Sequence, residues 1–170
     1  MTGSSGFKWW HSILILAGAN AVSALPAGFG GDFAFYNAFR QPDVAPPDWA
    51  FAPVWLVLNV TSLVALSRIA NAPNRSTMRM VFLWSEGMGW VLFSAFTTLY
   101  FLLHSPVLGA ADTVAGLIVG LVSLVCAFQL DRLSASFISL RVIWLILATY
   151  VSLFVATSNP DPFLGTGLLL

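Results

Sequence analysis

Residues 40–55 read RQPDVAPPDWAFAPVW and stand directly in front of a long apolar run. The prolines at 42, 46, 47 and 53 favour extended backbone and keep a helix from starting early in the stretch. Trp49 and Trp55 lie among them, and each indole combines a broad apolar face with one N–H donor. The stretch therefore predicts a rigid, aromatic-rich loop at the mouth of an apolar helix.

The composition indicates an integral membrane protein. Of 170 residues, 58% are hydrophobic and 8% are charged, and the mean hydropathy is +0.86; a soluble domain carries about 25% charged residues. Seven basic and seven acidic side chains cancel, so we expect no nucleic-acid partner. The single cysteine, Cys126, excludes an intrachain disulfide and a cysteine metal cluster. His11 and His104 are far apart in sequence, which argues against a metal site.

Five segments reach the roughly 20 apolar residues that a spanning helix needs. Because backbone polar groups in lipid must pair within the protein, we expect these segments to form helices that pack as a bundle. We predict an all-α fold, a single domain over residues 1–170, with spans at about 9–29, 50–69, 79–103, 107–130 and 135–157.

The basic residues gather at one set of predicted helix ends. By sequence position, these are Lys8, Arg68, Arg75, Arg79, Arg132 and Arg141. The opposite side has Arg40 alongside Asp32, Asp43, Asp48 and Asp161. An excess of lysine and arginine marks the cytoplasmic side. We therefore predict a multi-pass protein of a bacterial inner membrane, with the N-terminus in the cytoplasm and the C-terminus outside.

The stretch QPDVAPPDWAFAPVW resembles the motif of the TspO/MBR family, the tryptophan-rich sensory proteins that include the mitochondrial translocator protein. The five spans, the LHSP turn, Asp112 and Trp144 also fall where that family has them, so the resemblance covers nearly the whole chain. The motif residues that match are Pro42, Pro46, Pro47, Trp49, Phe51, Pro53, Val54 and Trp55, with Tyr36 upstream.

This resemblance implies a pocket among the helices that the proline-rich loop covers. In the family, such a pocket binds tetrapyrroles such as protoporphyrin IX, sterols and benzodiazepine-type compounds. We expect no obligatory cofactor, and the pocket would accept a porphyrin-type, carotenoid or lipid ligand. Trp49 also fits an aromatic belt that anchors the helix at the membrane interface. Carried over by position, the ligand-binding residues are Tyr36, Trp49, Trp55, Phe93, Phe96, Trp144 and Ala148.

The chain departs from the family pattern at several pocket positions. Val44 replaces a tryptophan, Phe93 and Phe96 replace an asparagine and a tryptophan, Asn59 replaces a tyrosine, and Leu140-Arg141 replaces Pro-Tyr. We read these changes as a loss of hydrogen-bonding groups, which predicts weaker porphyrin binding and a preference for apolar ligands such as carotenoids or sterols. Alternatively, Phe93 and Phe96 fill the pocket.

Polar and small residues inside the predicted spans allow two interpretations each. Asp112 should face inward, either to bind ligand or to hydrogen-bond between helices. Glu86 is either functional, or it reaches toward the interface or pairs with Arg79 or Arg141. Gly116 and Gly120 form a G-x-x-x-G pattern that serves helix packing or, together with Gly87, dimerisation.

Three functions are open at this point. The first is a sensor or carrier of hydrophobic small molecules, working as a monomer or homodimer in contact with membrane lipid. The second is an accessory structural subunit of a larger membrane complex, such as a photosynthetic pigment–protein assembly. The third is an enzyme, for instance one that degrades porphyrin in light. We predict no enzyme, because the sequence has no visible catalytic triad, phosphate loop or closely spaced acid pair.

Overall fold

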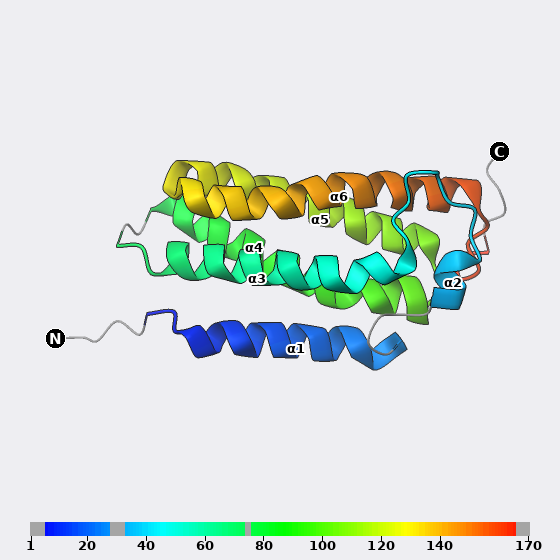
Figure 1. Cartoon of the computed structure of the whole chain (residues 1–170), viewed down its shortest axis with the longest axis horizontal. Coiled ribbons are helices and arrows are strands. Elements are labelled where there is room, and N and C mark those ends of the chain that lie inside the picture. Colours follow the sequence, from blue (N-terminus) through cyan, green and yellow to red (C-terminus); the bar gives the residue numbers. More distant parts are fainter. Residues whose placement is uncertain (1–5, 28–32, 74–75, 166–170) are drawn as a thin grey trace.

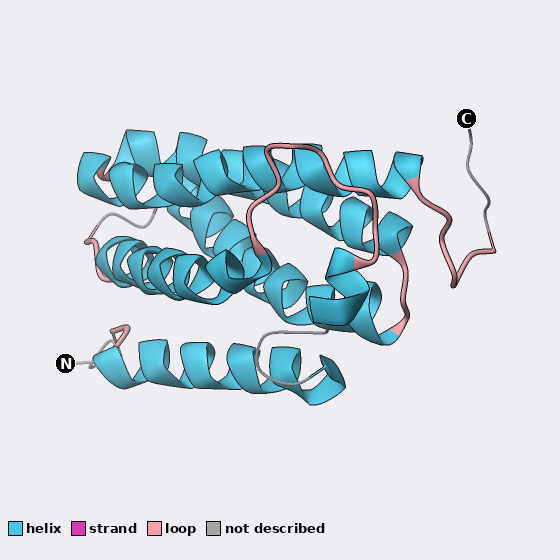
Figure 2. Cartoon of the chain, turned by 45° about the vertical axis from the view of Figure 1, so that its right-hand side comes forward, coloured by secondary structure: helices cyan, strands magenta, loops and turns pink. Residues whose placement is uncertain are grey.

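The structure is a computed structural model and describes residues 6–27, 33–73 and 76–165. The described part is helical and contains no β-strand (Figure 2). Its elements are α1 (Trp9–Ala27), α2 (Phe33–Asn37), the 3₁₀ turn η1 (Asp48–Ala50), α3 (Phe51–Ala70), α4 (Thr77–Thr97), the π-helical turn η2 (Thr98–Leu102), α5 (Pro106–Leu130) and α6 (Arg132–Ser158).

In the described part of the chain, five long helices lie side by side along one axis, and α2 with the following loop covers one end (Figure 1). Among the described residues, four helical stretches are long and apolar enough to cross a membrane: Asp48–Ala70, Thr77–Leu102, Pro106–Leu130 and Arg132–Ser158. The protein is thus a multi-pass membrane protein. The fifth long helix, α1, contains His11, Asn20 and Pro26, and its crossing of the membrane stays a prediction.

Capping residues explain where α4, α5 and α6 begin. Ser76 Oγ accepts the Arg79 N–H at the start of α4, and Ser105 Oγ accepts the Leu108 N–H at the start of α5. An Asp131 carboxylate oxygen accepts the Ser134 N–H at the start of α6. Each cap satisfies a backbone donor that the first helical turn leaves free. Before α5, His104 has a φ of 52°, which makes the tight turn from η2.

The G-x-x-x-G pattern serves packing within the chain. A Cβ on Gly120 would lie 3.3 Å from Leu145 Cδ1 and 3.5 Å from Val142 Cγ2, and one on Gly116 would lie 3.7 Å from Leu145 Cδ2. Both glycines therefore let α5 approach α6 closely. A Cβ on Gly87 would meet no atom within 4 Å, so this position of α4 is open to an outside contact.

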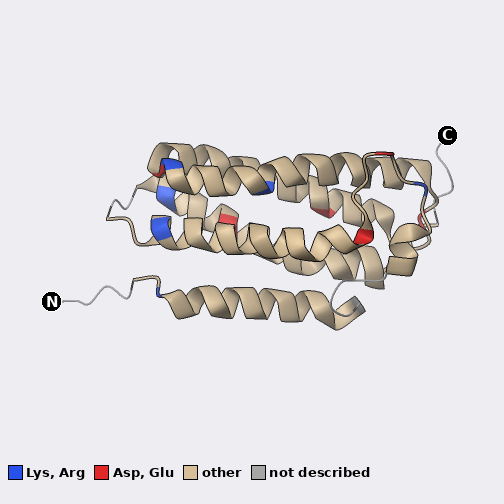
Figure 3. Cartoon of the chain, viewed as in Figure 1, with Lys and Arg blue, Asp and Glu red and all other residues tan. Residues whose placement is uncertain are grey.

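Most charged residues lie at the two ends of the bundle (Figure 3). Glu86, Asp112 and Arg141 lie between the ends, and Arg141 corrects the sequence-based count. Arg68, Arg79 and Arg132 lie at one end, as does Lys8 just before α1. Arg141, which we had placed near a helix end, is instead the tenth residue of α6, about 13 Å along the helix, and is buried. Asp32 and Arg75 lie outside the described residues.

Candidate ligand cavity

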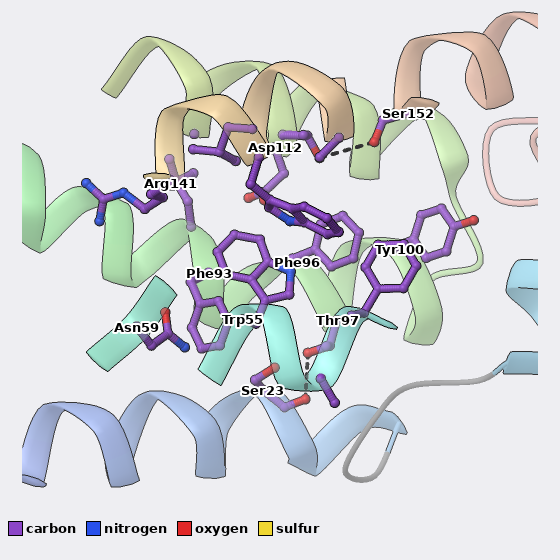
Figure 4. A pocket seen from close by; sticks show the side chains of 18 of the residues that line it. Ser23, Trp55, Asn59, Phe93, Phe96, Thr97, Tyr100, Asp112, Arg141 and Ser152 are labelled. Carbon is purple, nitrogen blue, oxygen red and sulfur yellow. Dashed lines mark hydrogen bonds between the residues drawn. The ribbon is translucent and has the colours of Figure 1, made fainter. Parts of the chain in front are cut away.

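A cavity of about 340 Å³ lies among the helices, beneath the loop that joins α2 to η1. It falls within the range of small-molecule sites, about 300–1,000 Å³. Side chains from α1, α2 and the four spanning helices line it (Figure 4). The predicted residues that line it are Tyr36, Trp55, Phe93, Phe96, Asp112, Gly116, Gly120, Trp144 and Ala148.

Aromatic rings form much of the cavity wall. Trp55 contacts Phe93 with ring centroids 5.2 Å apart, and Phe96 stacks on Tyr100 at 5.4 Å. Trp144 packs edge-on against Phe51 at 5.9 Å. Phe93 and Phe96 therefore belong to the wall and leave the cavity open (Figure 4). Trp55 and Trp144 line the same space.

Tyr36 fastens the proline-rich loop over the cavity. Its hydroxyl donates to the Pro46 carbonyl at 2.9 Å, and its ring packs edge-on against Phe51 at 5.2 Å. Burial, reinforced by the nearby charge of Asp48, raises the pKa of the Tyr36 phenol to about 12. The phenol therefore stays protonated, and able to donate, at neutral pH.

Further hydrogen bonds tie the loop to the neighbouring elements. Asn159, just after α6, accepts the Arg40 N–H at 2.8 Å and donates to the Arg40 carbonyl at 3.0 Å. Asn37 donates to Asp48 at 2.8 Å. Trp49 is 70% exposed and does not line the cavity, so of its two interpretations the structure favours the interfacial belt.

The residues after α6 are held by Asp161, which sequence reasoning did not place in any site. Its buried carboxylate accepts the Ser105 hydroxyl at 2.6 Å and the N–H groups of Val107, Phe163 and Leu164 at 2.8–3.0 Å. Burial alone would raise the pKa of Asp161, but these four donors outweigh it and lower the pKa below its ordinary value. The C-terminal segment is thereby attached to the start of α5.

The cavity also contains polar groups, which changes the sequence-based expectation of an apolar pocket. Asn59 and Arg141, which we had interpreted as losses from the family pattern, both line it. Asn20 and Ser152 add further polar atoms. The signal that could have found them is their residue type, because polar and charged side chains inside a spanning helix face the protein interior.

Three polar atoms on the cavity wall are buried without a hydrogen-bond partner among the described residues. They are the indole nitrogens of Trp90 and Trp144 and Oδ1 of Asp112. The predicted bond from Asp112 to another helix is thus not formed by this oxygen. The side chains that carry these two donors and one acceptor line a space that a small molecule could enter, although the three atoms themselves have almost no exposed surface.

A buried ion pair borders the cavity. Arg141 Nη1 lies 3.0 Å from Glu86 Oε2, Nη2 contacts Glu86 Oε1, and Ser62 hydrogen-bonds to both residues at 2.7–2.9 Å. Glu86 has no exposed surface. Of the predicted alternatives for Glu86, the structure shows the pair with Arg141; Arg79 donates to the carbonyls of Ile69 and Ala70 instead.

Together these features define a multi-pass helical membrane protein with an aromatic cavity under a proline-rich loop. The sequence model of the TspO/MBR family matches residues 12–157, and the chain belongs to that family. It is also similar to the tryptophan-rich protein TspO of Chlorobaculum tepidum, with 22% identity over 132 residues that cover 74% of this chain and 80% of that protein. The resemblance of the loop motif is thereby confirmed.

Proposed function

We propose that this protein binds flat, mainly hydrophobic molecules in the cavity among its helices and acts as their sensor or carrier, without catalysing a reaction. Porphyrins and sterols are ligand classes that its family membership favours, and carotenoids are added because they are flat and apolar. The cavity, its aromatic wall and the loop that covers it support this proposal.

The observation that carries the proposal is the set of unpaired polar atoms beside the aromatic faces. A buried polar group without a partner costs about 1–3 kcal/mol. A ligand that accepts from the indoles of Trp90 and Trp144 and donates to Asp112 would recover part of that cost. Ligands with polar atoms at their edge, such as porphyrins and hydroxylated sterols or carotenoids, should therefore bind better than pure hydrocarbons.

The proposal includes a topology. With α1 as a fifth span, the N-terminus and the C-terminus lie on opposite sides of a bacterial inner membrane. The positive-inside rule places the end with Lys8, Arg68, Arg79 and Arg132 in the cytoplasm. The cavity and its loop then lie toward the outer side, where Arg40 is accompanied by Asp43, Asp48 and Asp161.

Quenching of tryptophan fluorescence by porphyrin tests the site. We expect Trp55→Phe and Trp144→Phe each to weaken binding and to reduce the quenched fraction. Trp84→Phe is the matched control, because Trp84 is 75% exposed on α4 and does not line the cavity. Equal binding by all three variants would contradict the assignment of the cavity.

Purification of the protein from its membrane distinguishes a sensor or carrier from the alternative, an accessory subunit of a larger membrane complex. A sensor or carrier should be isolated as a monomer or homodimer that binds porphyrin. Isolation in fixed stoichiometry with other membrane proteins, and without porphyrin binding, would favour the structural role instead.

A further inference from the structure

A second cavity, of about 700 Å³, lies at the end of the bundle opposite the proline-rich loop. It opens where the start of α1 faces the end of α3 and the start of α4, and the Asn71 side chain donates to the Phe7 carbonyl across it at 2.8 Å. Ala70 and Thr77 end and begin two spanning stretches, so this cavity lies at the boundary between hydrocarbon and water. We call it the basic-end cavity.

Arg79 presents a fixed positive charge to the basic-end cavity. Its Nε donates to the Ile69 carbonyl at 3.1 Å, and its Nη2 donates to the Ala70 carbonyl. These two bonds hold the half-buried guanidinium against the end of α3, where the negative end of the helix dipole favours a cation. No hydrogen bond within the described part of the chain uses Nη1, which remains available as a donor.

His11 supplies a second donor from α1. Its Nδ1 accepts the backbone N–H of Lys8 at 2.7 Å, and its ring packs against Trp10 and Phe7 with centroids 3.7 Å and 5.2 Å away. Because Nδ1 acts as an acceptor, the proton of the neutral ring is on Nε2. His11 lines the same cavity as Arg79.

The charges around the basic-end cavity favour an anion. None of the described residues that line it is acidic. The acidic residue at this end of the described chain, Asp131, is already paired with Arg68 at 2.7 Å. Lys8 adds a further positive charge next to His11 (Figure 3).

The other lining residues favour a lipid over a free anion. Leu14 and Ile15 continue the cavity along α1, one turn beyond His11, and Leu14 is 61% exposed. Trp9 is 74% exposed at the same end, as is typical of the membrane interface. A polar end with donors and an apolar continuation toward the hydrocarbon match the two parts of a phospholipid.

We propose that the basic-end cavity binds an anionic phospholipid. The headgroup phosphate accepts hydrogen bonds from Arg79 Nη1 and His11 Nε2, and an acyl chain lies along Leu14 and Ile15. This site is independent of the ligand cavity, which lies under the loop at the opposite end. Basic pockets between spanning helices are suited to anionic headgroups.

Native mass spectrometry of the full chain released from detergent tests the proposal. The probes are phosphatidylglycerol and phosphatidylcholine with the same acyl chains. Both lipids carry the phosphate and differ in net charge, because the choline cation cancels the phosphate charge in phosphatidylcholine. We therefore expect preferential retention of phosphatidylglycerol by about fivefold, the effect of one basic residue beside an anionic lipid. Inorganic phosphate, added to lipid-free protein, is a separate arm and should neither remain bound nor raise the melting temperature.

Two variants and one control locate the effect. His11→Phe keeps the ring contacts and removes the Nε2 donor, along with the Nδ1 acceptor of the Lys8 N–H, so it should lower the retention of phosphatidylglycerol. Arg79→Gln removes the charge and should reduce the preference for phosphatidylglycerol over phosphatidylcholine. Arg68→Gln, a basic residue at the same end but outside the cavity, should retain it. If Arg79→Gln does not fold, His11→Phe decides. Unchanged retention of phosphatidylglycerol by His11→Phe, an equal loss of the preference in Arg68→Gln, or equal protection by inorganic phosphate would each overturn the proposal.

Discussion

Glu86 and Arg141, each the tenth residue of its helix, meet in the interior of the bundle, where Arg141 Nη1 lies 3.0 Å from Glu86 Oε2. Ser62 of α3 hydrogen-bonds to both, so the pair joins α3, α4 and α6. An ionised group at this depth is stable only with a partner of opposite charge and satisfied hydrogen bonds. The pair therefore fixes the relative positions of three spanning helices.

Replacing one residue of this pair should destabilise the fold much more than replacing both. We predict that Glu86→Leu or Arg141→Met alone lowers the free energy of unfolding by about 3–5 kcal/mol, because the remaining charge stays buried. The double variant Glu86→Leu/Arg141→Met should be far less destabilised than either single change. Reversible unfolding in mixed detergent micelles measures this, and a double variant as unstable as the sum of the singles would contradict it.

Gly109 and Gly87 form a matched pair for testing helix packing. A Cβ on Gly109 would lie 2.5 Å from Tyr100 Cδ2 and 3.2 Å from Tyr100 Cβ, so the base of that ring must move. We predict that Gly109→Ala destabilises the fold by about 1–3 kcal/mol, the typical effect of overpacking. The same substitution at Gly87, where a Cβ meets no atom within 4 Å, should not.

Gly87 also tests the prediction of a homodimer. If α4 forms the contact between two copies, Gly87→Leu should weaken association without lowering the stability of the monomer. Analytical ultracentrifugation in density-matched detergent measures the dissociation constant. A dimer unaffected by Gly87→Leu would exclude this face of α4.

The Tyr36 hydroxyl makes closure of the loop pH-dependent at high pH. Because burial raises the pKa of the closed-state phenol to about 12, closure favours the protonated form. Its contribution is complete below the ordinary pKa of about 10 and is lost as the pH rises toward 12. We predict that porphyrin dissociation accelerates over this interval, as measured by stopped-flow fluorescence.

Tyr36→Phe is the control for that pH dependence. It removes the bond to the Pro46 carbonyl, which contributes about 0.5–1.5 kcal/mol, so dissociation at neutral pH should be about two- to tenfold faster. The acceleration between pH 10 and 12 should be absent from this variant. If it persists unchanged in Tyr36→Phe, another group is responsible.

Sequence reasoning could predict the helices and the aromatic part of the cavity, because both follow from local information. Apolar runs predict the spans, and the motif around Trp55 predicts the proline-rich loop that covers the cavity. The position of Arg141 could not be predicted in the same way. Counting from a predicted helix end at about 135 placed it near the boundary, whereas its pairing with Glu86 depends on how α6 is aligned against α4.

The polar character of the cavity was missed for a related reason. Comparison with the family pattern identifies which hydrogen-bonding side chains of the pocket are absent from this chain. It does not identify which other polar side chains reach the cavity. Asn59 comes from α3 and Arg141 from α6, and only the packing of the helices brings them to one cavity. Trp49 lies within the 3₁₀ turn η1, two residues before α3, and its side chain is exposed.

The topology can be tested with single cysteines. In a Cys126→Ala background, Ser5→Cys should be inaccessible to a membrane-impermeant reagent in intact cells, and Thr166→Cys should be labelled. This result follows only if α1 crosses the membrane as a fifth span and the basic end faces the cytoplasm. Labelling of both positions would indicate that α1 does not cross.

The last prediction separates polar from apolar ligands at Asp112. Its Oδ1 is buried at the cavity wall without a partner among the described residues, so a ligand hydroxyl that donates to it gains a hydrogen bond, about 0.5–1.5 kcal/mol. Removing the carboxyl group with Asp112→Leu should weaken binding of a hydroxylated carotenoid by about two- to tenfold. It should leave binding of the hydrocarbon carotenoid with the same skeleton unchanged or slightly stronger, because that ligand leaves Oδ1 unpaired. Titration of both carotenoids by absorbance measures the two dissociation constants. A parallel change in the two would show that Asp112 acts through packing and does not contact the ligand.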